Sequence, residues 1–270
     1  MRNGFVRAEI LLTVAFLVFL PCTHASAISC PAPEFTSADQ IQINGSAVIL
    51  VTHATMKFDL RRTIESGLDA TIRFADQNGV PFVYLHDKDD NPATYFYPSC
   101  TPTYWYNSGS GDFRFTFDAT HVISLGGFSE ACQGLTVGHI SRVWSQSRFG
   151  DKDLRLSLVT DGIYSFDLLW ISKNDPFYPE YKMWKESLPT QGDVSVQEIR
   201  ELIRQTTADV RAWEAVVLKR WFDLTLRDLP KTHRIVFAID SSPVEVIREG
   251  TSKEAATLTI DFVNSTLLKL

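Results

Sequence analysis

The sequence has few cysteines, no excess of positive charge and no second apolar run of membrane-spanning length. Four cysteines occur in 270 residues, and the 26 Lys and Arg residues are outnumbered by 32 Asp and Glu residues, which gives a net charge of −6. Because no basic stripe is present, we expect neither a nucleic acid nor an anionic membrane surface as a partner. After the first 27 residues no apolar run approaches the roughly 20 residues of a membrane span, so we expect a soluble mature protein.

Residues 1–27 have the pattern of a secretory signal peptide. Two arginines precede an apolar stretch at 10–20, and Ala25-Ser26-Ala27 supplies small residues for cleavage. The apolar stretch is shorter than a comfortable span, although an uncleaved anchor is the alternative. We therefore expect the mature chain to begin near Ile28 and to be periplasmic or secreted, without a membrane span.

The mature chain keeps three cysteines, Cys30, Cys100 and Cys132. In an oxidising compartment an odd count indicates one disulfide and one remaining thiol. Three single bridges can be drawn, and the sequence alone does not choose among them. A Cys30–Cys100 bridge is the economical pairing, because it would tie down the new N-terminus and leave Cys132 as the thiol.

The middle of the chain alternates between strand-like and helix-like segments. The apolar run 47–52 predicts a strand buried on both faces, and the helical spacing over 61–78 closes at Asn78-Gly79, a typical C-cap. Further strands are predicted at 81–85, 113–117, 122–125 and 154–160, with a long loop at 86–111 and a helix after Cys132. This order is typical of an α/β three-layer sandwich with a mainly parallel sheet.

The pattern changes after residue 172. The range 194–229 reads as a long helical segment that begins with Ser195 and Glu198 as a capping box. Strand-like alternation at 233–246 and 256–263 then predicts a terminal hairpin. We accordingly divide the chain into a signal peptide at 1–27, an α/β core at 28–172, and a C-terminal helical segment and β-hairpin at 173–270 that packs on the core.

The segment from His121 to Trp144 combines the features of a nucleophile site. Its apolar strand breaks at Gly126-Gly127 and leads to Cys132 at the start of a helix. Helix N-terminal amides and the macrodipole favour the thiolate form of such a cysteine. The alternative is an inert buried cysteine, since free Cys is among the most buried residue types.

Four segments, in this order, resemble the isochorismatase-like cysteine hydrolases, the group that includes nicotinamidases: AVILVTHATMKFD, GVPFVYLHD, HVISLGGFSEAC and LRLSLVTDG. The resemblance covers roughly residues 45–170 and implies an isochorismatase-like, Rossmann-like fold. It also implies hydrolysis of a small amide or related acyl substrate through a thioester. Cys132 would be the nucleophile, Asp59 the carboxylate that handles the proton, and the amides of Ala131 and Cys132 the oxyanion hole.

The family's catalytic lysine has no counterpart, because the range 106–122 contains no lysine. This absence favours an alternative function, a noncatalytic binding or assembly module of the cell envelope that keeps the hydrolase-like fold. The partner is then an envelope protein rather than a small-molecule substrate. A homo-oligomer is compatible with either function.

Other residues at the predicted strand ends are candidates for binding. His53, His86 and Asp87 could hold a divalent metal ion, although strand-end histidines more often bond to the backbone. No other cofactor is indicated.

The predicted loop at 86–111 is rich in aromatic residues. Tyr104 and Trp105 from this loop are candidates for substrate binding, together with Ser129 and Glu130 beside the predicted nucleophile. The alternative is a loop that packs on itself.

Overall fold

A computed structural model shows how the predicted elements are arranged. It describes residues 34–35, 42–54, 59, 62–86, 100–108, 113, 116–129, 131–146, 152–165, 173–174, 178–187, 194–206, 210–211, 214, 226, 229, 233–249 and 255–270. Within these residues no helix is long and apolar enough to cross a membrane.

A ten-stranded sheet forms the centre of the molecule, with the strand order β1-β5-β4-β3-β7-β8-β12-β10-β11 and β9 paired to β8. Its strands are β1 (Glu34–Phe35), β3 (Ala47–Thr52), β4 (Phe82–His86), β5 (Thr103–Asn107), β7 (His121–Gly126), β8 (Leu154–Ser165), β9 (Val194–Ser195), β10 (Arg234–Ile239), β11 (Ser242–Arg248) and β12 (Thr257–Val263). A separate parallel pair consists of β2 (Gln42–Ile43) and β6 (Thr116–Phe117). All pairs in the large sheet are parallel except β10–β11 and β8–β9.

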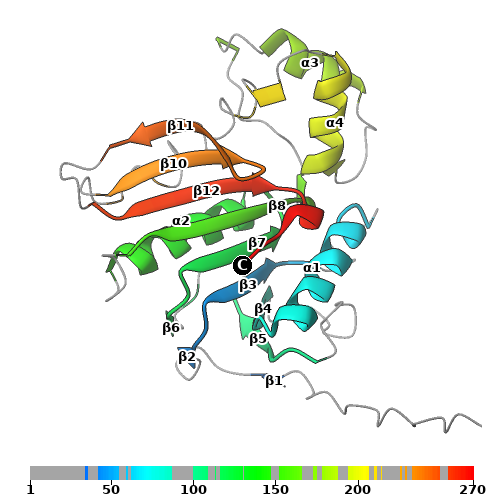
Figure 1. Cartoon of the computed structure of the whole chain (residues 1–270). Coiled ribbons are helices and arrows are strands. Elements are labelled where there is room, and N and C mark those ends of the chain that lie inside the picture. Colours follow the sequence, from blue (N-terminus) through cyan, green and yellow to red (C-terminus); the bar gives the residue numbers. More distant parts are fainter. Residues whose placement is uncertain are drawn as a thin grey trace, which may run out of the picture.

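Two helices cover opposite faces of the sheet, with α1 in front and α2 behind it (Figure 1). The chain runs from β3 through α1 (Glu65–Asn78) to β4, and from β7 through α2 (Cys132–Gln146) to β8. These two crossovers lead away from the β3–β7 pair in opposite directions, so right-handed connections place the helices on opposite faces. Two further helices, α3 (Tyr178–Ser187) and α4 (Val196–Thr206), and the short 3-10 helix η4 (Ser265–Leu267) complete the described elements.

The predicted fold class is confirmed, because the strand order and the parallel pairing are those of an α/β sandwich. The strand at 47–52 has the bounds predicted for it, and every one of its residues is buried. Gly79 ends α1 in the left-handed conformation at φ 64°, as the Asn78-Gly79 pattern predicted. The capping box at α4 is also present, since Ser195 and Glu198 exchange side-chain-to-backbone hydrogen bonds of 2.8 and 3.0 Å.

The predicted loop at 86–111 contains a strand instead. Residues 103–107 form β5, which pairs in parallel with β4. The aromatic run in this segment suits a strand because Tyr and Trp have high β-propensity on a half-buried pleated surface.

The C-terminal strands join the central sheet. The hairpin is made by β10 and β11, whose two-residue turn has positive φ at Asp240 (48°) and Ser241 (66°). The second segment of the predicted hairpin is β12, which instead lies in parallel between β8 and β10. Chain segments on both sides of residue 172 therefore contribute strands to one sheet.

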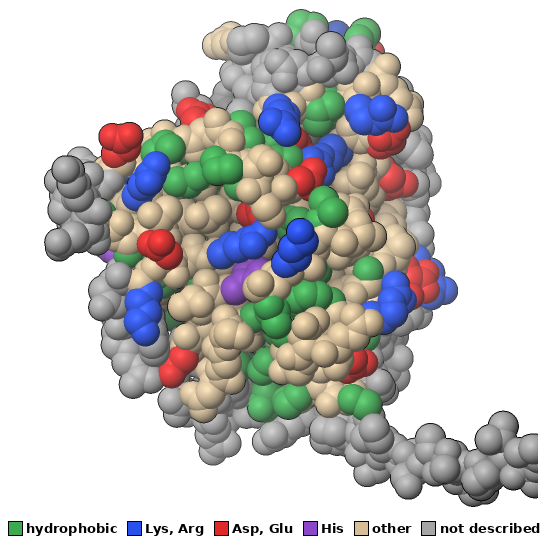
Figure 2. Space-filling view, in the orientation of Figure 1, with side chains coloured by type: hydrophobic (Ala, Val, Ile, Leu, Met, Phe, Trp, Pro, Cys, Tyr) green, Lys and Arg blue, Asp and Glu red, His purple; other side chains and the backbone are tan. Residues whose placement is uncertain are grey.

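Charged side chains are interspersed on the face that carries α1 (Figure 2). Acidic and basic groups of the described residues both occur across this face, and uncharged atoms cover most of the surface between them.

Candidate functional site

The ends of β3 and β7 mark the point where the strand order changes direction. From β3 the chain connects toward β5, whereas from β7 it connects toward β12. Thr52 at the end of β3 lies in register with Gly126 at the end of β7. In open α/β sheets of this kind, ligands bind in the crevice beyond the carboxyl ends of these two strands.

Two glycines let the backbones approach closely at this point. A Cβ on Gly126, which has φ 102°, would lie 1.9 Å from the carbonyl oxygen of Thr52. A Cβ on Gly127 would lie 2.3 Å from the ring of Tyr164. The amide of Gly127 donates a 2.8 Å hydrogen bond to the Thr52 carbonyl. Glycine is therefore required at both positions of the Gly126-Gly127 turn.

The side chain of Tyr164 packs against this turn. Its side chain is fully buried, and its ring meets that of Phe128 edge to face at 4.8 Å. Its hydroxyl donates to the carbonyl oxygen of His53 at 2.8 Å, and its own carbonyl accepts from the amide of Ser129 at 3.0 Å. Tyr164 thus links β8 to the residues that follow both β3 and β7.

Cys132 is the first residue of α2 and follows this turn, as the sequence predicted. It is half-buried and takes part in no disulfide. The amide of Ala131, predicted to belong to an oxyanion hole, donates instead to the carbonyl of Phe128 at 3.0 Å. Gln133 donates to the same carbonyl at 3.0 Å. The Ala131 amide is thus engaged by the Phe128 carbonyl in the turn that leads into α2.

A hydroxyl pair fastens the first turn of α2 to β3. Thr136 donates its hydroxyl proton to the carbonyl of Cys132 at 3.0 Å. The hydroxyl oxygens of Thr52 and Thr136 lie 3.0 Å apart in the buried space between helix and strand. Because Thr136 has a single hydroxyl proton, Thr52 is the donor in this pair. The backbone of Cys132 is therefore held in place by neutral groups.

Two buried polar atoms beside Cys132 have no hydrogen-bond partner among the described residues. They are Oγ of Ser129, a residue 1% exposed, and Oε1 of Gln133, a residue 0% exposed. The side-chain nitrogen Nε2 of Gln133 donates to the hydroxyl of Ser124 on β7 at 2.8 Å, and its unpartnered Oε1 is an acceptor. Buried polar atoms are normally paired, so both atoms are candidates for contact with a ligand.

Asp59 holds the turn that leads into α1. Its carboxylate accepts hydrogen bonds from the amide of Thr63 (2.9 Å), the hydroxyl of Thr63 (2.8 Å) and the amide of Ile64 (3.1 Å). The side chain is buried, at 4% exposure. These three hydrogen bonds commit the carboxylate to the turn before α1, so the geometry suits a turn anchor better than a proton acceptor.

The candidate metal ligands are only partly described. His53 is buried, has φ 49° and lies directly after β3, while His86 ends β4 with its ring 6.0 Å from that of Trp105. Asp87 lies outside the described residues. Within the described part of the chain, no three His, Cys, Asp or Glu residues are grouped so that they could hold a metal ion.

The candidate binding residues occupy different environments. Trp105 is 2% exposed and stacks on Tyr84 with ring centroids 4.7 Å apart, so it belongs to the aromatic core between β4 and β5. Tyr104, its neighbour on β5, is half-buried and also packs against the core. Ser129 lies in the turn before α2, and Glu130 lies outside the described residues.

Among the cysteines that the structure describes, Cys132 takes part in no disulfide. Cys30 lies outside the described residues, so the pairing of Cys30 with Cys100 stays a prediction.

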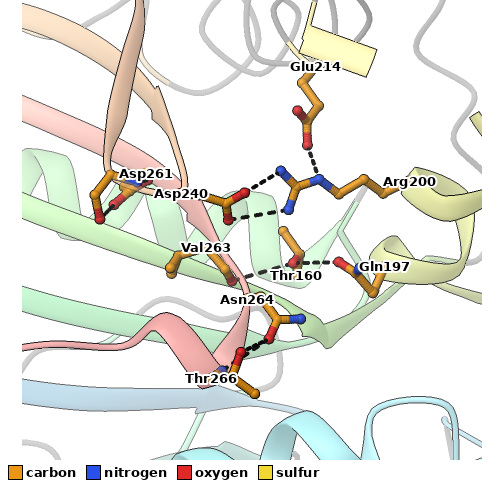
Figure 3. A network of polar contacts seen from close by, with 10 residues as sticks. Thr160, Gln197, Arg200, Glu214, Asp240, Asp261, Val263, Asn264 and Thr266 are labelled. Atoms are coloured by element: carbon orange, nitrogen blue, oxygen red, sulfur yellow. Dashed lines mark hydrogen bonds and ion pairs between the residues drawn. The ribbon is translucent and has the colours of Figure 1, made fainter. Parts of the chain in front are cut away.

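A second polar region lies at the same edge of the sheet, around the ends of β8, β12 and β10 (Figure 3). Arg200 of α4 contacts Glu214 (Nε to Oε1, 2.6 Å) and, with two nitrogens, Asp240 after β10 (2.9 and 3.4 Å). Burial raises the pKa of Glu214 to about 7, with Asp240 raising it and Arg200 and Arg211 opposing the shift.

Sequence reasoning missed several of these groups. Gln133 is a polar residue at a helix position that faces a strand, and such a residue in a predicted core position was the available signal. The hydroxyl pair of Thr52 and Thr136 gives no such signal, since the two residues are distant in sequence. The contacts of Arg200 likewise depend on the sheet topology.

Comparison with solved structures finds several proteins to which the chain is similar, among them the three that follow. The MAR1 ribonuclease from Caenorhabditis elegans is 14% identical, with 70% of this chain and 95% of that chain covered and a TM-score of 0.33. N-carbamoylsarcosine amidase from Thermoplasma acidophilum is 14% identical, covers 52% and 92% of the two chains, and has a TM-score of 0.31. An isochorismatase from Pseudomonas putida KT2440 is 15% identical, with 61% and 84% covered and a TM-score of 0.29.

The similar structures thus include an isochorismatase, the kind of protein that the sequence resembles. No protein-family model and no curated protein matches the chain. Because the TM-scores lie between 0.29 and 0.33, the function proposed below rests on this chain's own residues.

Proposed function

We propose that the chain binds a small ligand in the crevice at Cys132 and does not hydrolyse it. The observation that carries this proposal is the pair of unpartnered buried atoms beside Cys132, Ser129 Oγ and Gln133 Oε1. The hydroxyl can donate or accept, and the amide oxygen can only accept. A ligand with a neutral donor next to an acceptor, such as a primary carboxamide, complements both.

The surroundings of Cys132 support binding without catalysis. Acyl transfer to a thiol needs a group that moves a proton to the leaving amine. The carboxylate of Asp59 already accepts three hydrogen bonds from the turn before α1. At the end of β3 stands Thr52, whose hydroxyl is bonded to Thr136. The contacts that hold the start of α2 are thus made by polar, uncharged groups, those of Thr52, Thr136 and Gln133.

Thermal denaturation in the presence of acetamide or benzamide tests the proposal. A ligand at ten times its Kd stabilises the folded state by about 1.4 kcal/mol, which raises Tm by about 3–5 °C in a domain of this size. Benzoate, which lacks the donor, should have a smaller effect. Gln133→Leu and Ser129→Ala should abolish the carboxamide shift, and Cys132→Ser should retain it.

Ser141→Ala is the matched control. Ser141 is also buried on α2, but its hydroxyl donates to the carbonyl of Val137 within the helix. The carboxamide shift should survive in this variant. Equal shifts in wild type and Gln133→Leu, or no shift with any carboxamide, would contradict the proposed ligand chemistry.

Thiol-dependent hydrolysis of a small amide or related acyl substrate is the second candidate. The position of Cys132 favours it, since the thiol begins a helix at the crevice where β3 and β7 end. This candidate predicts turnover of acyl esters or amides that Cys132→Ser abolishes without lowering Tm. Turnover that is absent, or unchanged in Cys132→Ser, removes the thiol from any mechanism.

We further propose that residues 1–27 direct export to the periplasm or the cell exterior and are then removed. The pattern of the signal sequence supports this. N-terminal sequencing of protein recovered from that compartment should begin near Ile28. Peptide mapping without reduction should recover Cys30 linked to Cys100, and a chain that keeps its first 27 residues would overturn the proposal.

A further inference from the structure

Only one of the two carboxyl oxygens of Glu214 has a hydrogen-bond partner among the described residues. Its Oε1 accepts from Nε of Arg200 at 2.6 Å, while its Oε2 is buried with no hydrogen-bond partner in the described part of the chain. The side chain is 4% exposed. A buried carboxylate with an unsatisfied oxygen is costly in its ionised form, so this environment favours the protonated acid.

Arg200 is shared between two carboxyl groups. Its other two nitrogens hold Asp240 in a bidentate pair in the β10–β11 turn (Figure 3). When Glu214 is protonated, Arg200 and Asp240 form a balanced ion pair. When Glu214 ionises, two carboxylates compete for one guanidinium, and the extra charge lies in a buried place. The charged groups known to face Glu214 are Arg200 from α4, Arg211 from its own helical segment, and Asp240 from the turn.

The same contacts attach α4 to the sheet. Arg200 lies on α4, and Asp240 directly follows β10. Gln197, also on α4, accepts a 3.0 Å hydrogen bond from Thr160 of β8. β9, which directly precedes α4, pairs with Tyr164 and the residue after it. Tyr164 packs against Phe128 and binds the amide of Ser129 in the turn that leads to Cys132, so the attachment of α4 is connected to that turn.

We propose that Arg200, Glu214 and Asp240 form an acid-closed clasp, which fastens α4 to the carboxyl edge of the sheet and loosens as the pH rises past neutrality. The proposal is independent of the function assigned to Cys132. It concerns only the attachment of α4.

The direction follows from proton linkage. Burial raises the pKa of Glu214 from 4.5 to about 7, so the closed clasp binds more protons than the open one between these values. The stabilisation is fully present below pH 4.5 and is lost as the pH rises through about 7. Between pH 6 and 8.5 the opening equilibrium should therefore rise about tenfold. His121, whose pKa burial lowers to about 4, titrates mostly below this range.

Hydrogen exchange of the full-length protein, followed by mass spectrometry at pH 6 and pH 8.5, tests the clasp. After normalisation to intrinsic exchange rates, the protection of α4 amides should fall about tenfold in wild type over this range. In Glu214→Gln, which has the same shape but cannot ionise, the protection should not change with pH.

Glu201→Gln is the matched control. Glu201 also lies on α4 and also pairs with an arginine, Arg204, but the pair is solvent-exposed. This variant should keep the wild-type pH dependence. Equal pH dependence in wild type and Glu214→Gln would overturn the proposal, as would a flat profile in Glu201→Gln.

Asp240→Asn gives a second, independent measurement. Removing the Asp240 charge removes one cause of the raised pKa of Glu214, so the pH at which α4 loses protection should move downward. A midpoint that stays in place or rises would contradict the clasp.

Discussion

The two polar regions at the carboxyl edge of the sheet differ in the kind of polar group that they contain. The crevice at Cys132 follows β3 and β7 and is made of hydroxyls, amides and close backbone contacts around one thiol. The clasp follows β10 and is made of one arginine between two carboxyl groups. The crevice thus contains buried polar atoms without hydrogen-bond partners among the described residues, Ser129 Oγ and Gln133 Oε1. The clasp contains a buried carboxyl group, that of Glu214, whose charge depends on pH.

This difference separates two roles that one edge of a sheet can serve. Unpartnered neutral atoms beside a crevice can be satisfied by a ligand, and they add no means of moving a proton. Charges that satisfy each other fix the position of a helix, and they respond to protons because burial shifts their titration. We propose that in this chain the charged groups hold α4 in place and the neutral groups bind a ligand.

The largest loss of stability is expected from a substitution that adds a side chain where β3 and β7 come close together. Gly126→Ala places a methyl group 1.9 Å from the Thr52 carbonyl, at a φ of 102° that disfavours alanine. The free energy of unfolding should fall by about 4 kcal/mol or more, measured by urea denaturation. Gly79→Ala, with φ 64° but no atom within 4 Å, should cost only about 1 kcal/mol. Similar losses at both positions would contradict the close contact.

The next largest effect tests the charges of the clasp. Arg200→Met leaves Glu214 and Asp240 without their shared cation, and should lower the free energy of unfolding by about 3 kcal/mol at pH 8. At pH 6 the loss should be smaller, because Glu214 is then largely protonated. Arg204→Met, which breaks the exposed pair with Glu201, should have no measurable effect. Equal losses at both pH values would mean that Glu214 does not titrate between them.

A smaller loss of stability is expected at Asp59, where the measurement distinguishes a turn anchor from a catalytic carboxylate. Asp59→Ala removes three hydrogen bonds from the turn before α1 and should lower the free energy of unfolding by about 2 kcal/mol. The rate at which iodoacetamide labels Cys132 should not change below the unfolding temperature. A labelling rate that falls severalfold in this variant would restore Asp59 as the partner of the thiol.

The smallest effect concerns the hydroxyl pair under Cys132. Thr52→Val removes the donor to Thr136 and leaves a buried oxygen short of one partner. The free energy of unfolding should fall by about 1 kcal/mol, and α2 amides near Cys132 should exchange faster. An unchanged exchange profile would show that the pair does not hold the start of this helix.

Local patterns in the sequence predicted the elements that depend on local chemistry. The strand at 47–52, the C-cap at Gly79 and the capping box of Ser195 and Glu198 all formed as expected. Each is encoded within a few neighbouring residues. The strand at 103–107 lacks such a local signal, because its short aromatic run lies among Pro, Ser and Gly residues that favour turns.

The sites were less predictable because they depend on which elements meet. An Asp that follows a predicted strand has the same sequence pattern whether it moves protons or anchors a turn. The hydrogen bonds of Asp59 with the turn before α1 depend on how the chain folds at that point. Arg200, Glu214 and Asp240 come from three separate segments, and the strand order brings them together. The placement of Cys132 was predictable, since strand, glycine turn and helix follow one another directly along the chain.

The most direct test of the crevice is the pH dependence of iodoacetamide labelling of Cys132 in the native protein, resolved by peptide mass spectrometry. If the crevice binds ligands without proton-transfer groups, labelling should reach half its maximum rate within about one unit of pH 8.5, the ordinary thiol value. The profile should be the same in Asp59→Ala. A midpoint well below pH 7 that moves upward in Asp59→Ala would contradict the account and identify Cys132 as an activated nucleophile.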